Sequence, residues 1–259
     1  GGTDAAGESG SDVADATVGT PWRVALRPEA ADRVADEFVL STRGQGLREA
    51  GTLEVRIGAT DDPAVLSAED AAFAIAGPTA EPTLLSDAGP SSSVRAGARA
   101  RFDAAAPFED VGPSRETLRA SARDDLSTAF AAELDAALEG AERLDRRADA
   151  NVLTLSLAVG ARTDHLFGDV RTWAEHAGIA AREQFIAPRD ALVDRGLVET
   201  IKTPIGRGHP HSRLRVADEA LAECAPVELV DVLAERFAGR SGHGGGGDAS
   251  SDRTPVWRR

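Results

Sequence analysis

Large apolar side chains are scarce in this chain, and their scarcity limits what it can fold into. Val, Leu, Ile and Phe account for 55 of 259 residues, whereas Ala alone accounts for 49. Asp and Glu outnumber Lys and Arg by 43 to 29, giving a net charge of -14. Such a composition lies close to that of chains that do not fold in ordinary water. We therefore expect a core that depends on small residues.

We interpret the acidic composition first as an adaptation to a salty habitat and only second as a sign of function. Abundant carboxylates with a single lysine, Lys202, are typical of a halophilic protein, because concentrated salt screens the self-repulsion of negative charge. The same charge disfavours a general affinity for nucleic acid or for anionic membranes. Any contact with DNA must therefore come from a local basic patch.

Cysteine content and hydropathy favour a cytoplasmic protein. The single cysteine, Cys224, cannot form a disulfide within the chain, and we expect it to be a small buried residue. No apolar run approaches the ~18 residues of a membrane span, and residues 1–20 lack the apolar stretch of a signal peptide. We expect no contact with a membrane.

The hydrophobic pattern predicts an α+β protein with two domains between disordered tails. Residues 1–20 and 239–259 are built from Gly, Ser, Asp and Thr, which bury too little surface to offset the entropy of ordering. Residues 21–148 are predicted to form a small α/β domain with a helical segment, for ligand sensing or dimerisation. Residues 149–238 are predicted to form a winged helix-turn-helix domain.

Short apolar runs alternate with helical patterns in the first domain, which is typical of an α/β fold. A helix is predicted over 29–43 and another over 93–105. Strands are predicted over 22–27, 52–57, 64–67, 71–77 and 83–85.

A longer helical stripe follows, with a start signal at Ser114. Apolar residues recur at helical spacing from Leu118 to Leu144, which predicts one long amphipathic helix. The stripe either packs on its own domain or forms a dimerisation helix.

The order of elements after residue 150 predicts the winged helix. Helices are predicted over 151–166, 169–179 and 180–196, with Gly178 and Gly196 at helix ends. Strands over 197–204 and 213–218 with a turn-rich loop between them predict a hairpin, the wing. Trp173 is expected to be a core anchor rather than a base-stacking platform.

Positive charge gathers on this hairpin. Residues 195–215 contain five cations and one acid, a local net charge of +4. Phosphate contacts are assigned to the wing, and base reading to side chains that offer paired donors or acceptors. The candidate base readers are Arg182, Gln184 and Arg189. The candidate wing residues are Lys202, Arg207, His209, His211, Arg213 and Arg215.

The segments TWAEHAGI, ALVDRGLVETIKTPI and GHPHSRLRV resemble the C-terminal winged helix of the haloarchaeal TbsP-like transcriptional regulators. EFVLSTRGQGLREAGTLEVRI and AFAIAG are similar to the α/β domain before it. The resemblance covers roughly residues 22–235. It implies a transcriptional regulator that binds double-stranded promoter DNA, with metabolism as the setting. We expect a homodimer on a two-fold related site and a small-molecule metabolite as effector.

Two departures from the family pattern stand in the DNA-binding region. The family wing tends to carry Arg-Pro-Arg where this chain has His209-Pro210-His211, so its charge depends on pH. The recognition stretch reads Phe185-Ile186-Ala187-Pro188, and the proline predicts a kink or a helix that restarts at Pro188. Pro188 and Ile186 also motivate an alternative, a winged-helix interaction module that acts as a co-regulator without reading bases.

Enzyme and metal sites are not predicted. The chain lacks the P-loop, GxSxG and HExxH motifs, so no catalytic residue and no cofactor is expected. The pairs Asp61-Asp62 and Glu69-Asp70 are interpreted as solvated turns. His209, His211 and His243 lie on a loop and a glycine-rich tail, too loosely placed for a metal site.

Overall fold

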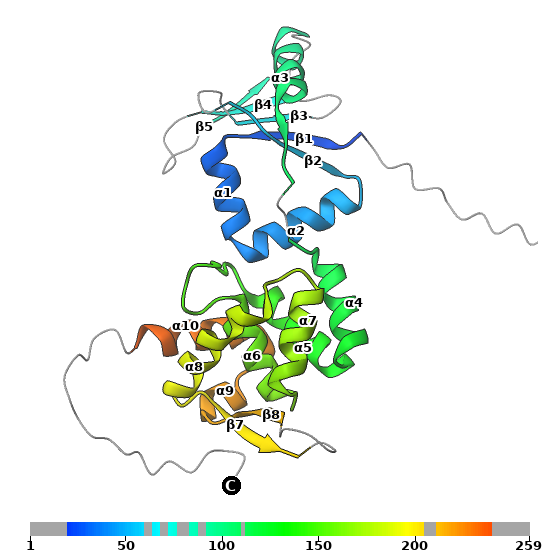
Figure 1. The fold of residues 1–259 in the computed structure, drawn as a ribbon. Helices are drawn as coiled ribbons and strands as arrows, with labels where there is room; N and C mark the ends of the chain where they lie inside the picture. The colour runs from blue at the N-terminus through cyan, green and yellow to red at the C-terminus, as the bar shows by residue number, and fades with distance from the viewer. Residues whose placement is uncertain are drawn as a thin grey trace, which may run out of the picture.

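A computed structural model describes residues 20–59, 64–67, 72–76, 83–87, 92–109, 112–204 and 211–239. Two units lie one above the other in Figure 1, with a sheet at the top and a small hairpin at the bottom. The structure is mixed helix and sheet, which confirms the α+β class. Apart from Thr20 and Gly239, both predicted tails lie outside the described residues.

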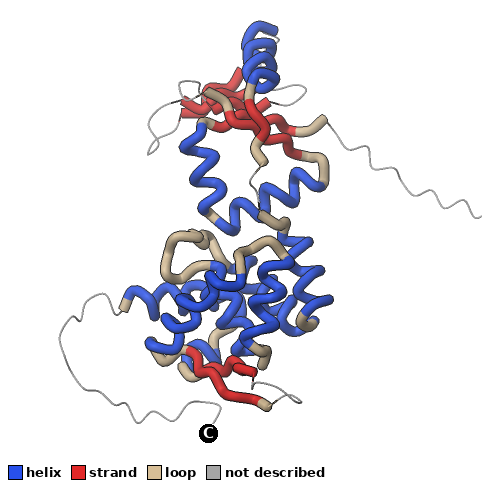
Figure 2. The backbone as a smooth tube through the Cα atoms, in the orientation of Figure 1, coloured by secondary structure: helices blue, strands red, loops and turns tan. Residues whose placement is uncertain are grey.

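The upper unit contains a six-stranded sheet of order β5-β4-β3-β1-β2-β6 (Figure 2). β1 and β2 are parallel and joined by two helices, while the other pairs are antiparallel. All five predicted strands are present, and β6 was not predicted. The elements are β1 (Trp22–Leu26), α1 (Pro28–Asp36), α2 (Phe38–Glu49), β2 (Leu53–Ile57), β3 (Ala64–Ser67), β4 (Ala72–Ala76), β5 (Thr83–Asp87), α3 (Ser92–Ala104) and β6 (Ala106–Pro107).

The single helix predicted over 29–43 is wrong, because the chain breaks at Glu37. Glu37 has extended backbone angles, and its carboxylate accepts hydrogen bonds from the amides of Val39 and Leu40. A side chain that caps the next helix outweighs the continuous amphipathic pattern. The chain therefore turns between α1 and α2.

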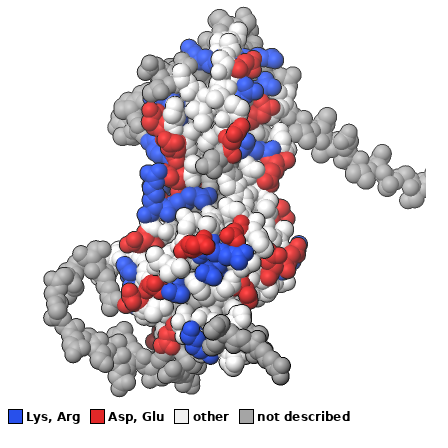
Figure 3. Space-filling model, in the orientation of Figure 1, with Lys and Arg blue, Asp and Glu red and all other residues white. Residues whose placement is uncertain are grey.

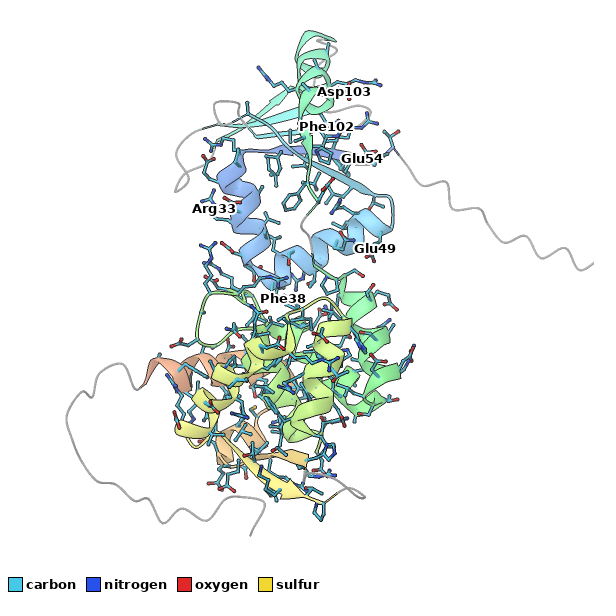
Figure 4. The ribbon with its side chains drawn as sticks, in the orientation of Figure 1. Arg33, Phe38, Glu49, Glu54, Phe102 and Asp103 are labelled. Carbon is cyan, nitrogen blue, oxygen red and sulfur yellow. The ribbon has the colours of Figure 1, made fainter. Side chains whose placement is uncertain are left out.

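The described core of the upper unit is small. Ala31 and Phe108 are buried, with half-buried Leu26, Val55 and Ile57 against them. Phe102 of α3 (labelled in Figure 4) is buried separately. The Arg56 guanidinium lies 4.7 Å from the centroid of its ring. Small residues and arginine stems thus supply packing that larger apolar side chains would normally provide.

The lower unit is mainly helical. Its elements are α4 (Arg115–Asp125), α5 (Thr128–Gly140), α6 (Val152–Arg162), α7 (Phe167–His176), the 3-10 turn η1 (Arg182–Phe185), α8 (Ile186–Asp194), β7 (Val198–Thr203), β8 (His211–Val216), α9 (Glu219–Glu223), the 3-10 turn η2 (Pro226–Glu228) and α10 (Leu229–Ala238).

The long helix predicted after Ser114 is also split. Ser114 caps α4 as predicted, but the chain breaks at Leu126, and the Ser127 hydroxyl caps α5 by accepting from the amide of Phe130. Most of the apolar stripe is buried within the chain, including Leu118, Leu134 and Leu144. The stripe is therefore core, and the interpretation as a dimerisation helix is wrong for these buried positions.

One continuous core fills the lower unit. Trp173 is buried, its ring packs edge-on against Phe130 at 5.0 Å, and its indole nitrogen donates to Ser121. The core anchor role of Trp173 is thus confirmed. The same buried cluster extends from Phe38 of α2 to Phe237 of α10. The cluster contains residues on both sides of position 148, where the sequence predicts the boundary between the two domains. That domain boundary stays a prediction.

Arg162 of α6 links this helix to α5 and α9. Its guanidinium pairs with Glu133 of α5 and donates to the carbonyl oxygens of Ala222 and Cys224 at 3.2 and 3.1 Å. Cys224 follows α9 and is half-buried, whereas the sequence predicted a buried residue. This partial burial raises the pKa of its thiol.

Residues 141–151, the segment after α5, contact the turn between α1 and α2. We call this junction of the two units the waist. The Phe38 amide donates to the carbonyl oxygen of Leu144 at 2.9 Å, and the Arg146 amide donates to that of Asp36 at 2.8 Å. The Arg146 guanidinium lies 4.7 Å from the Phe38 ring centroid. Backbone hydrogen bonds and a cation–π contact therefore fix this junction.

Candidate nucleic-acid interface

Three helices and a hairpin form the predicted winged helix. α7 and α8 are connected through Gly178, whose φ of 73° is the left-handed conformation that favours glycine. Gly196 ends the third helix with a φ of 68°, and β7 follows directly. β7 and β8 pair in antiparallel fashion. The helix-turn-helix and the two strands of the wing are therefore present.

The recognition segment begins differently from expectation. Instead of one helix over 180–196, the 3-10 turn η1 precedes α8, which begins at Ile186. Pro188 is the third residue of α8, in a first turn whose amides have no acceptor within the helix. Proline is tolerated there, so α8 begins at Ile186 and continues through Pro188 instead of restarting at it.

The predicted base readers lie close to the start of α8, and the two arginines have acidic partners. Arg182 pairs with Glu175 at 2.5 Å, and Arg189 pairs with Asp190 at 2.6 Å. The Arg189 guanidinium also lies 4.9 Å from the Phe167 ring centroid. Gln184 is exposed and accepts a hydrogen bond from the Ala181 amide.

The outward side of α8 is partly apolar. Ile186 and Val193 are 44% and 37% exposed, and Asp190 lies one turn from Ile186. An apolar and acidic helix side differs from the cationic surface that phosphate contact favours. For DNA to bind along α8, Arg182 and Arg189 must therefore release Glu175 and Asp190 and contact phosphate instead.

The register of the hairpin divides its side chains between two faces. Arg213 lies opposite Ile201, Arg215 opposite Glu199, and His211 opposite Thr203, so these pairs share one face. Leu214 and Val216 are buried and define the other face. Lys202 belongs to that second face by register, but it lies nearer the hairpin tip and is exposed.

Asp164, which sequence reasoning missed, neutralises part of the wing. Its carboxylate oxygens lie 2.9 Å from the Arg213 guanidinium and 3.0 Å from that of Arg215. Its backbone φ is 65°, and its carbonyl oxygen accepts a further bond from Arg213 at 2.8 Å. Asp tolerates this left-handed conformation after a helix, but nothing in the local sequence indicates a contact across 49 residues.

The segment that holds Asp164 is attached to the hairpin by its backbone. The Leu214 amide donates to the carbonyl oxygen of His165 at 3.0 Å, and Leu166 forms a bridge with Arg213. Burial lowers the pKa of His165, whose ring packs edge-on against Phe130. Burial therefore favours the neutral form of the His165 imidazole.

The count of +4 along the hairpin overstates the free charge of the wing. Arg195 lies 4.0 Å from Asp149 and stacks on Phe237, so three of the five cations have acidic partners. Lys202 has no acidic partner within the part of the chain that the structure describes. His211 is exposed at the start of β8. Arg207 and His209 lie outside the described residues.

Among the described residues, no group of three or more His, Cys, Asp or Glu side chains is arranged to hold a metal ion. His209 and His243 lie outside these residues, as do the acid pairs Asp61-Asp62 and Glu69-Asp70. No helix in the described ranges is both long and apolar enough to cross a membrane.

Comparison with known proteins identifies the lower unit. No curated protein and no solved structure matches the chain. A family model described as "Transcriptional regulator TbsP-like, C-terminal HTH domain" matches residues 114–234. This range begins at the cap of α4 and ends within α10, so it contains the helix-turn-helix and the hairpin. Residues 114–234 are therefore similar to the C-terminal helix-turn-helix domain of the TbsP-like transcriptional regulators.

Proposed function

We propose that this protein regulates metabolic genes in a halophilic archaeon by binding promoter DNA through its winged helix. The observation that carries the proposal is the family match over residues 114–234, a range that contains the three helices and the hairpin. The resemblance and the acidic composition support the metabolic setting and the archaeal origin, and the cysteine content and hydropathy support a cytoplasmic location.

The wing supplies the proposed phosphate contacts. Lys202 is exposed without an acidic partner among the described residues, and Arg213 and Arg215 share one carboxylate between two guanidinium groups. One negative charge cannot neutralise two positive ones, so this pair keeps a net positive charge. Arg207, His209 and His211 extend the proposed wing surface, and Arg182, Gln184 and Arg189 are proposed to contact bases.

A homodimer is proposed because helix-turn-helix proteins commonly bind two half-sites related by a two-fold axis. The upper unit is proposed to sense a metabolite or to mediate pairing. Its small described core and its junction with the lower unit through α1 and α2 support a sensing role, because a ligand at the junction would contact both units.

Chromatin immunoprecipitation with sequencing in the native host tests the proposal first. Sharp promoter peaks that disappear in an Arg207→Ala, Arg213→Ala variant are expected. In vitro, a Lys202→Gln, Arg207→Gln, Arg213→Gln variant should bind such a promoter more weakly, with a salt slope flatter by about 0.9 for each lost phosphate contact.

The matched control carries Arg99→Gln, Arg119→Gln and Arg123→Gln, three exposed arginines that lie away from the hairpin. It loses the same charge and should keep most of its DNA affinity. Equal weakening in both variants would show that net charge, rather than the wing, determines binding.

A second candidate function is that of a protein-interaction module. The exposed Ile186 and Val193 on α8, together with the pairing of Arg182 and Arg189, favour it. Co-purification of a protein partner that is lost in an Ile186→Ser, Val193→Ser variant, without enriched DNA, would support this role over direct promoter binding.

A further inference from the structure

Three arginines gather at the waist of the molecule, far from the wing. Figure 3 shows Lys and Arg side chains concentrated at this level, over α1 and the segment below it. An open cavity of about 460 Å³ lies here, and Arg33 of α1, Arg43 of α2 and Arg143 of the segment after α5 line it. Figure 4 shows Arg33 above the start of α2, where Phe38 is labelled.

These arginines differ from most cations of this chain. Arg33, Arg43 and Arg143 are exposed, and none has an acidic partner within the described residues. In contrast, Arg115, Arg162, Arg182, Arg189, Arg213 and Arg215 all pair with carboxylates. A chain with a large excess of acids that leaves three arginines unpaired around one cavity presents a local positive site.

The two acids at the cavity do not cancel this charge. Glu37 accepts hydrogen bonds from the amides of Val39, Leu40 and Leu144, so backbone donors hold its carboxylate in place. Glu142 is exposed and has no partner in the described part of the chain. Three guanidinium groups therefore face two carboxylates, and the lining keeps a net formal charge of +1.

The remaining wall of the cavity is apolar. Val34 and Leu40 contribute to it, and Leu40 is 49% exposed. A neighbouring hollow, which Arg33 also lines, has a different character. Glu29, Asp32 and Asp36 line it, and Asp36 pairs with Arg147 at 2.8 Å. Only the first of these two cavities combines unpaired guanidinium groups with an apolar surface.

We propose that the waist cavity binds a small polyanion, an organic phosphate or polycarboxylate whose charged groups contact Arg33, Arg43 and Arg143. Guanidinium groups bind phosphate and carboxylate through paired, charge-assisted hydrogen bonds. Arg33 and Arg43 belong to the upper unit, and Arg143 lies between α5 and α6 of the lower unit, so the ligand bridges the two units. As an effector site, the cavity rests on the proposed regulatory function.

Isothermal titration calorimetry of the full chain tests the site without DNA. The probes are pyrophosphate for the phosphate class and citrate for the carboxylate class, at an ionic strength held constant with NaCl. Saturable binding of at least one probe is expected, and the stronger probe identifies the class. Phenyl phosphate should bind more tightly than inorganic phosphate if the apolar wall contacts the ligand.

An Arg33→Gln, Arg43→Gln variant should weaken binding of the stronger probe by about tenfold or more. The control Arg99→Gln, Arg119→Gln loses the same charge elsewhere and should bind as the parent does. Glu142→Gln should tighten binding, an effect of opposite sign that loss of folding cannot produce. Arg143→Gln should weaken it, since that arginine contributes from the other unit.

Absence of saturable binding by both probes would overturn the proposal, as would equal affinity in the parent and the Arg33→Gln, Arg43→Gln variant. Promoter binding by the same preparation is measured separately. Anion binding without promoter binding would support the anion site and contradict the proposed function. Promoter binding without anion binding would support the proposed function and contradict the anion site.

Discussion

The arginines of the wing and those of the waist occupy opposite electrostatic situations in one acidic chain. Arg213 and Arg215 share the carboxylate of Asp164, whereas Arg33, Arg43 and Arg143 line a cavity without acidic partners in the described residues. The wing was prominent in the sequence because its cations are close together along the chain. The waist arginines are distributed over 110 positions and gather only through folding. The density of charge along the sequence therefore does not show how many of those charges are free to bind a ligand.

The largest expected effect comes from removing the carboxylate at the wing. Asp164→Asn should increase affinity for promoter DNA about tenfold, because both guanidinium groups become available to phosphate. Asn also tolerates the left-handed backbone of this position. Fluorescence anisotropy with labelled promoter DNA measures the change.

Asp36→Asn is the matched control, because it removes an acid that pairs with Arg147 at the waist. It should change DNA affinity far less than Asp164→Asn does. An equal gain in the two variants would mean that net charge, and not the release of wing arginines, is responsible.

Lys202→Gln should have a smaller effect, a loss of about fivefold in DNA affinity with a salt slope flatter by about 0.9. Lys202 is exposed and has no described acidic partner, so its charge is already available. Anisotropy titrations over a series of salt concentrations measure both quantities. An unchanged slope would exclude Lys202 from contact with phosphate.

A modest pH dependence of stability is expected from His165 beside the wing. Burial lowers its pKa in the folded protein, so the unfolded chain takes up a proton at higher pH than the folded chain does. The free energy of unfolding should therefore decrease as pH falls below about 6.5. Urea unfolding at several pH values measures this, and His165→Gln should flatten the profile between pH values of about 7.5 and 5.5. The same profile in both proteins would contradict this assignment.

The smallest effect on DNA binding is expected at the waist. Arg33→Gln should leave promoter affinity within about twofold of the parent in the absence of an added polyanion, because Arg33 lies on α1, away from the hairpin (Figure 1). A loss as large as that of Lys202→Gln would show that the waist itself contributes to the DNA-binding surface.

Much of the fold was predictable where the signal is local. Short apolar runs predicted the strands, Gly178 and Gly196 predicted helix ends, and Ser114 predicted a helix start. The predictions failed where an amphipathic pattern continued across a break. At Glu37 and Ser127 a side-chain cap begins a new helix, and the apolar spacing alone does not reveal it.

The sequence by itself determined the order of elements in the winged helix and the excess of acid, because both follow from neighbouring residues and composition. Only the tertiary structure decided which charges remain available. Asp164 reaches Arg213 and Arg215 through the attachment of the His165 segment to β8, and the waist arginines meet where α1, α2 and the segment after α5 converge. Coulomb interactions depend on distance in space, and the chain brings these groups together only when its core forms.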